Sequence, residues 1–217
     1  MPEISRLHFP VTSLGYGRRA GIWFQGCTVR CPGCMSRDTW PSLPESRMAV
    51  KEILQWLGDL RGHVDGVTIS GGEPSEQPEA LRELVEKLRL WEEALENPLD
   101  ILLYSGRPLE EVVAELPWIP ALVDVLISDP FEQEAPTDLG LRGSSNQRVN
   151  VFSALGAERY SEDDLATVYM AQRREIGVQV DGSSVWMTGI PLEGDLKALD
   201  AALRQKGVTM GRKSWFS

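Results

Sequence analysis

The stretch DGVTISGGEP, from Asp65 to Pro74, shows the pattern that the rest of the core repeats. Its apolar run ends in two glycines and a glutamate, a pattern typical of a short buried strand that stops at a turn. Apolar residues recur at helical spacing on both sides of it, and the positions are Val50, Ile53, Leu54, Leu57 and Leu60 before it and Leu81, Leu84, Val85, Leu88 and Leu95 after it. This spacing predicts one helix before the strand and one after it.

Three further apolar runs are predicted to be strands of the same kind. They are RAGIWFQG, which ends at Gly26, DILLYSG, which ends at Gly106, and LVDVLIS, which ends at Ser128. Strands that alternate with helices favour an α/β fold with a mainly parallel sheet, in which ligands bind at the carboxyl ends of the strands. The glycines and the glutamate at these ends are therefore candidates for a binding site.

The last third of the sequence has a different pattern. Ile176, Val178 and Val180 alternate before an Asp-Gly turn, and Val185 and Met187 follow it, which predicts a hairpin with one buried face. A helix is predicted from about Gly194 to Gln205. We therefore divide the chain into a core of residues 1–150 and a C-terminal extension of residues 151–217 packed on it. We expect the hairpin to cover the open edge of the sheet, with a cover over the mouth of the site as the alternative.

The charge balance narrows the choice of partners. Lys and Arg together number 22 against 32 for Asp and Glu, which gives a net charge of -10. This surplus of negative charge opposes broad binding to nucleic acid. The sequence has no long apolar run, and its start, MPEISRLHFPVTSLGYG, lacks the charged-then-apolar pattern of a leader. We expect a soluble cytoplasmic protein that binds neither nucleic acid nor membranes.

All three cysteines, Cys27, Cys31 and Cys34, lie within eight residues after the first predicted strand. An odd number of cysteines this close together cannot form a closed disulfide framework. Three thiolates at this spacing suit an iron-sulfur cluster that keeps one iron open for chemistry. Structural zinc is the alternative and would need a fourth ligand, for which His8 and His63 are the only histidines. Chance clustering is the third interpretation.

Two other segments carry candidate ligand groups. In the opening stretch, Gly71 and Gly72 allow a close approach to the backbone, and Glu73 can accept a hydrogen bond from an ammonium group. The alternative is a plain strand-ending turn with a glutamate at a helix start. Farther along, the Ser144–Asn146 loop can bond to a ribose or to a partner's backbone, or it is simply a capped polar loop.

Together these segments resemble a known family. CxxxCxxC followed by a GGE motif at the end of the next strand resembles the radical S-adenosylmethionine (radical SAM) superfamily. Within it, GCTVRCPGCMSRDTW, SGGEP, DVLISDPF and RGSSNQR resemble the branch of anaerobic ribonucleotide reductase activating proteins, over about residues 5 to 150. The resemblance implies a partial (β/α) barrel of radical SAM type, to which this chain adds a hairpin and a helix.

The resemblance also implies a site and a reaction. Cys27, Cys31 and Cys34 match the ligands of a [4Fe-4S] cluster whose open iron chelates SAM. The residues expected to contact SAM are Gly71, Gly72, Glu73 and Pro74, with Gly33, Ser105 and Asn146 as further candidates. Reductive cleavage of SAM would give methionine and a 5′-deoxyadenosyl radical, which takes a hydrogen atom from a glycine of a partner glycyl-radical enzyme. The electron would come from a donor such as flavodoxin or ferredoxin.

The sequence departs from the family pattern in three places. Gly33 stands where many radical SAM proteins have an aromatic residue, and Asp129-Pro130 stands where the branch has Asp-Gly before the phenylalanine. The chain also continues well beyond the RGSSNQ segment, where activators of this branch end. A stand-alone radical SAM enzyme that modifies a peptide or a small molecule therefore remains an alternative, as does a non-catalytic metal-binding module. No catalytic side chain beyond the cofactors is predicted.

Overall fold

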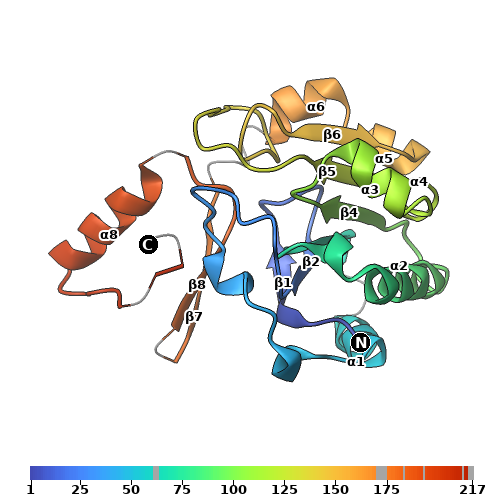
Figure 1. Ribbon diagram of the computed structural model, residues 1–217, viewed down its shortest axis with the longest axis horizontal. Helices are drawn as coiled ribbons and strands as arrows, with labels where there is room; N and C mark the ends of the chain where they lie inside the picture. The colour runs from blue at the N-terminus through green and yellow to red at the C-terminus, as the bar shows by residue number, and fades with distance from the viewer. Residues whose placement is uncertain (61–63, 170–174, 183, 193, 212, 215–217) are drawn as a thin grey trace.

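A computed structural model describes residues 1–60, 64–169, 175–182, 184–192, 194–211 and 213–214 (Figure 1). His63, one of the two candidate zinc ligands, lies outside the described residues. The core is a six-stranded sheet in which the strands follow one another in chain order. They are β1 (Ile4–Val11), β2 (Arg19–Phe24), β3 (Gly66–Gly71), β4 (Asp100–Tyr104), β5 (Val125–Ser128) and β6 (Arg148–Val151).

The central strands of the sheet run parallel. β2 pairs with β3, β3 with β4 and β4 with β5 in parallel, whereas β1 and β6 pair antiparallel at the two edges. The α/β fold with a mainly parallel sheet is confirmed, and its edges β1 and β6 stay apart, so the sheet is open. Phe24 is in register with Gly71. The carboxyl ends of β2 and β3 therefore lie level, and the segments that follow them start side by side.

Helices pack on both faces of this sheet. The α-helices are α1 (Val50–Asp59), α2 (Pro78–Glu92), α3 (Leu109–Glu115), α4 (Ile119–Leu122), α5 (Ala154–Arg159), α6 (Glu162–Ala166) and α8 (Asp195–Gln205), and short 3-10 turns are η1 (Arg37–Thr39), η2 (Pro44–Ser46) and η3 (Pro74–Glu76). The helices predicted around the opening stretch are confirmed as α1 and α2, whose apolar stripes are buried against Ile22, Phe24 and Ile69. Figure 1 shows α1 and α2 together on one side of the strands and α5 and α6 on another.

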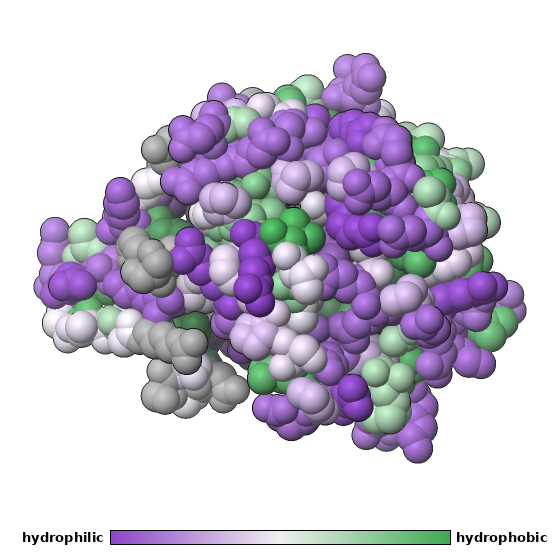
Figure 2. All heavy atoms as spheres, in the orientation of Figure 1, coloured by the Kyte–Doolittle hydropathy of each residue, from purple (hydrophilic) through white to green (hydrophobic). Residues whose placement is uncertain are grey.

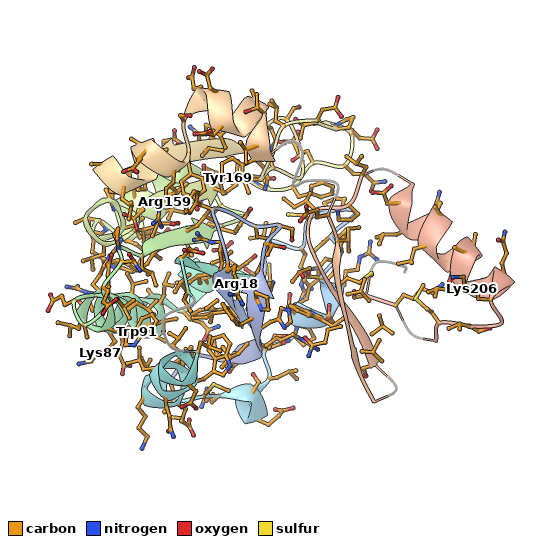
Figure 3. All side chains as sticks on the ribbon, turned by 180° about the vertical axis from the view of Figure 1, so that it is seen from behind. Arg18, Lys87, Trp91, Arg159, Tyr169 and Lys206 are labelled. Atoms are coloured by element: carbon orange, nitrogen blue, oxygen red, sulfur yellow. The ribbon has the colours of Figure 1, made fainter. Side chains whose placement is uncertain are left out.

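A buried charged cluster lies at the starts of β2 and β4. The guanidinium of Arg19 and the carboxylate of Asp100 are both fully buried and lie 2.8 Å apart. Asp100 also accepts hydrogen bonds from Arg159 at 2.6 Å and from the Tyr160 hydroxyl at 2.8 Å. Burial alone would raise the pKa of Asp100, but these cationic and hydrogen-bonding neighbours hold it below its usual value. Figure 3 shows Arg159 beside Tyr169, whose hydroxyl donates to the Arg159 carbonyl at 2.6 Å.

Residues after 151 contribute to the core as well. Tyr160, Leu165 and Tyr169 pack in one buried cluster with Leu102 of β4 and with Val125 and Ile127 of β5. A division of the chain at residue 150 therefore remains a proposal about its organisation. The part that stands apart from the sheet is the segment from β7 (Gly177–Asp181) and β8 (Ser184–Thr188) to α8, which lies at one end of the molecule in Figure 1.

The predicted hairpin exists, but its expected buried face is wrong. β7 and β8 form their own two-stranded sheet and do not extend the edge strand β1. Val178, Val180 and Val185 are 57%, 68% and 48% exposed. The hairpin is held instead by Trp186, whose ring packs edge-on against the rings of His8 and Trp23. The ring centroids lie 4.8 Å apart in each pair. One large aromatic side chain offers more contact area than the valines, so it decides which face turns inward.

Among the described residues, no helix is long and apolar enough to cross a bilayer. Figure 2 shows hydrophilic residues over most of the face seen in Figure 1, with hydrophobic side chains in separate small groups.

Candidate cluster and cofactor site

A cavity of about 1090 Å³ opens at the carboxyl ends of the central strands. Of the residues predicted from the sequence, those that line it are Cys27, Cys31, Gly33, Cys34, Gly71, Gly72, Glu73 and Ser105. These residues come from segments that follow three different strands, β2, β3 and β4. Their meeting in one cavity is the arrangement expected for a ligand site in a parallel sheet.

The cysteines lie on a loop that leaves β2 and closes on itself. The backbone N–H of Gly26 donates to the Thr39 carbonyl at 2.7 Å, and that of Cys27 donates to the Trp40 carbonyl at 3.0 Å. These two bonds bring the ends of the loop together. All three thiols are free and half-buried along the wall of the cavity.

Burial raises the pKa of the Cys27 and Cys31 thiols above its usual value. A raised pKa keeps a thiol protonated near neutral pH when no metal is bound. Since metals bind the thiolate form, loading of this loop would release protons.

The two glycines of the opening stretch join β3 to the cysteine loop. Gly71 has a φ of 108°, and a Cβ on it would collide with the backbone of Phe24. A Cβ on Gly72 would collide with the carbonyl of Gly26. Glycine is thus required because the start of the cysteine loop lies directly against this backbone. There the Glu73 N–H donates to the Gly26 carbonyl at 2.8 Å. The end of β3 and the cysteine loop are therefore held together by these backbone contacts.

Glu73 is the buried acidic group among the residues that line the cavity and is only 1% exposed, whereas the other lining carboxylates, Glu134 and Asp138, are not among the buried residues. Its carboxylate accepts hydrogen bonds from Ser75 N at 3.0 Å, Ser105 Oγ at 2.9 Å and Gly106 N at 2.7 Å. Burial raises its pKa, and these donors oppose part of the rise. A carboxylate offers about four acceptor positions. The three hydrogen bonds therefore leave one acceptor position for a cationic ligand in the cavity.

Two of the predicted contacts are not among the residues that line the cavity. Pro74 is buried as the first residue of η3. Asn146 donates from its side-chain amide to the Pro130 carbonyl at 2.8 Å, so it braces the loop after β5. Its neighbours Gly143 and Gln147 do line the cavity.

Several lining residues could not be identified from the sequence. In the cysteine loop and beside it, Trp23, Arg37 and Trp40 contribute to the wall. The extension contributes a further part of the wall, with Met187, Thr188, Ile190, Leu192 and Lys197 among its lining residues. No local motif marks the positions in the extension, because they reach the cavity only where the chain returns to the body after residue 150.

The donor set fits a group with three thiolate ligands. His8 packs against Trp186 and is not among the residues that line the cavity, so it does not complete a zinc site with the cysteines. In the part of the chain that the structure describes, no three side chains of His, Cys, Asp or Glu gather tightly enough for a single metal ion. Three thiols along one wall suit a larger cluster, three of whose irons each take one cysteine.

Comparison with known proteins agrees with this chemistry. Residues 13–150 match the family described as 4Fe-4S single cluster domain. The anaerobic ribonucleoside-triphosphate reductase-activating protein of Escherichia coli K12 is 32% identical over 152 residues, which cover 66% of this chain and 95% of that protein. The protein of that name from Enterobacteria phage T4 is 31% identical over 136 residues, which cover 62% and 85%. The pyruvate formate-lyase-activating enzyme of Clostridium pasteurianum is 30% identical over 133 residues, which cover 59% and 54%. The chain therefore belongs to the 4Fe-4S single cluster domain family, together with the activating proteins of anaerobic ribonucleoside-triphosphate reductase.

Proposed function

We propose that this protein is a radical SAM activase that installs a glycyl radical on a partner enzyme of the anaerobic ribonucleotide reductase or pyruvate formate-lyase type. The observation that carries the proposal is one cavity that holds three free thiols and a buried glutamate at the ends of neighbouring parallel strands. The relatives named as activating proteins support the choice of reaction.

In this proposal the cysteine loop holds the cluster. Cys27, Cys31 and Cys34 each ligate one iron of a [4Fe-4S] cluster, which leaves the fourth iron open to SAM. When bound and reduced by one electron, the cluster and SAM together supply methionine and a 5′-deoxyadenosyl radical that abstracts a hydrogen atom. The protein contributes orientation, exclusion of water and the choice of substrate, because the difficult chemistry belongs to the cofactors.

The end of β3 binds the methionine part of SAM in this proposal. Glu73 offers its remaining acceptor position to the SAM ammonium group, and Ser105 and Gly106 hold the carboxylate in place through their hydrogen bonds. Gly71 and Gly72 keep this carboxylate beside the cysteine loop, since they allow the two backbones to touch. The SAM ammonium group at Glu73 and the open iron on the cysteine loop would then lie at the same wall of the cavity.

The proposal includes an electron donor and a compartment. The donor is a low-potential one-electron carrier of the flavodoxin or ferredoxin class. We assign the reaction to the cytoplasm, because free thiols that must load a cluster require a reducing environment.

The proposal is tested by electron paramagnetic resonance with intact candidate partners. The protein is reconstituted anaerobically with iron and sulfide, reduced, and mixed with SAM and one glycyl-radical enzyme at a time from the same genome. A glycyl doublet on one partner, in an amount that follows the methionine formed, is the expected result. Cleavage of SAM without a protein radical on any partner contradicts the activase function, and bound zinc with no iron contradicts the radical SAM chemistry itself.

Replacement of Glu73 tests the proposed SAM contact. Glu73→Gln removes the negative charge that faces the ammonium group, and a charge-assisted hydrogen bond contributes about 1.5 to 3 kcal/mol, so SAM affinity should fall about ten- to a hundredfold. Iron content should not change, because the cysteines are intact. Equilibrium binding of SAM to the cluster-loaded protein measures the effect, and Glu79→Gln, at an exposed position in the first turn of α2, is the matched control. Equal SAM affinity in Glu73→Gln and the wild type would leave Glu73 with a structural role only.

A further inference from the structure

The segment from β8 to the start of α8 forms one wall of the cavity that holds the cysteines. Its lining residues include Met187, Ile190, Leu192 and Lys197. The match to the 4Fe-4S family ends at residue 150, so this wall comes from the part of the chain beyond the matched region. It faces the same cavity as Cys34 and Glu73.

The wall is fastened to the body by Trp186, which does not line the cavity, and by Ile190, which does. Trp186 packs edge-on against Trp23 and His8, and the Arg6 guanidinium lies over its ring at 4.7 Å from the centroid. Ile190 packs with Val11 and Leu14 in the same small apolar cluster. These contacts hold the segment in a defined position over the inner face of β1 and β2, which a loose tail would not have.

The chemistry of the wall indicates what it contacts. Met187, Ile190, Pro191 and Leu192 are apolar, and Lys197 is the one ionised side chain among the lining residues of the extension. A charged small molecule needs several converging polar groups for recognition. An apolar wall suits instead the side chains and methylene groups of an extended polypeptide.

We propose that residues 187–192 are the specificity-determining wall of the radical site, and that they contact the residues on either side of the target glycine in a polypeptide substrate. This inference rests on the proposed function and adds a substrate contact from outside the matched family region. Trp186 acts as a positioning residue for this wall, since it meets the body and not the cavity.

The test uses peptides from the partner that gives the glycyl signal in the experiment above. Twelve-residue peptides centred on its target glycine, with deuterium at the glycine Cα, are given to the reduced, cluster-loaded protein with SAM. The readout is deuterium recovered in 5′-deoxyadenosine per methionine formed, which is the coupling ratio. Isothermal titration of the same peptides without SAM gives their Kd without any turnover.

Leu192→Glu places a charge on the wall at a residue outside the packed apolar cluster around Trp186. A carboxylate buried against an apolar peptide loses its hydration, so the coupling ratio should fall and the Kd should rise, each about tenfold or more. Val180→Glu is the matched control, because Val180 is 68% exposed and does not line the cavity. Its Kd and coupling ratio should stay within about twofold of the wild type.

Peptides of opposite charge distinguish a direct contact between residue 192 and the peptide from damage to the fold. Peptides with lysine on either side of the glycine should bind Leu192→Glu more tightly than the neutral peptide does, and should show no such gain with the wild type. Trp186→Ala should raise the Kd of the neutral peptide, and Trp186→Phe should restore much of the binding.

Three results would overturn the inference. They are equal Kd and coupling ratio for Leu192→Glu and the wild type, a loss in Leu192→Glu that lysine-flanked peptides do not relieve, and intact-partner activation that Leu192→Glu performs as well as the wild type. Each of them leaves the glycyl radical formed by the wild-type protein, and so the proposed function, untouched.

Discussion

Replacement of any one of Cys27, Cys31 and Cys34 by alanine is expected to abolish both the iron-linked absorbance and the cleavage of SAM. In the proposed cluster three of the four irons each take one thiolate from the protein, and with three cysteines in the chain no other thiol can substitute for a lost one. Iron should fall from about four per chain to below about one. The fold should persist, because all three side chains are half-buried and none belongs to a packed apolar cluster.

Iron and sulfide analysis, visible absorbance and methionine release measure this effect, and far-ultraviolet circular dichroism checks the fold. Pro32→Ala is the matched control, since Pro32 is an exposed residue of the same loop. It should keep its iron and its SAM cleavage. A single-alanine variant that retains full iron content and cleavage would exclude that cysteine from the site.

The second large effect is expected at the buried charged cluster. Asp100→Asn leaves the Arg19 guanidinium fully buried without its charge partner, and breaking a buried ion pair in this way costs about 3 to 5 kcal/mol. This is a large part of the stability of a domain, which is about 5 to 15 kcal/mol. Urea denaturation of the metal-free protein measures the loss. Asp59→Asn, at an exposed carboxylate near the end of α1, should change the free energy of unfolding by less than about 0.5 kcal/mol.

The loss should depend on pH with a definite sign. The neighbours of Asp100 hold its pKa below the usual value, so its ionised form stabilises the folded state above the unfolded pKa of about 4, and this contribution is lost as pH falls through the folded pKa. The gap in stability between wild type and Asp100→Asn should therefore narrow below about pH 4. Replacement of both partners, Arg19→Met with Asp100→Asn, should recover part of the loss. A single-variant loss under about 1 kcal/mol would show that the pair is not a main support of the fold.

Much of the core could be predicted because its signals are local. The apolar stripe of Val50, Ile53 and Leu57 is a property of one short segment, and a helix with such a stripe must bury it. The three cysteines likewise lie within eight residues, and this spacing favours a thiolate-bound metal without any knowledge of the fold. Parallel strand order then brings the loop after β2 and the GGE segment after β3 to one edge of the sheet, as the sequence predicts.

The hairpin shows where a local pattern was insufficient. Alternating Val178 and Val180 predicted a buried face, yet these residues are exposed, and the opposite face with Trp186 turns inward. Both faces of this hairpin carry apolar groups. Which of them is buried depends on the surface that the hairpin meets, here His8 and Trp23 on β1 and β2, and no pattern within the hairpin contains that information.

Residues close together in the chain were enough to predict the β-α order of the core, the two helices around the opening stretch and the three thiols on one loop. The tertiary structure alone decided that Ser105 and Gly106 hold the carboxylate of Glu73, that Asp100 pairs with Arg19, and that the segment after β8 forms a wall of the cysteine cavity. Arg19 and Asp100 are 81 positions apart. Contacts between residues so far apart form only when the complete chain packs together. The periodicity of any single segment therefore does not predict them.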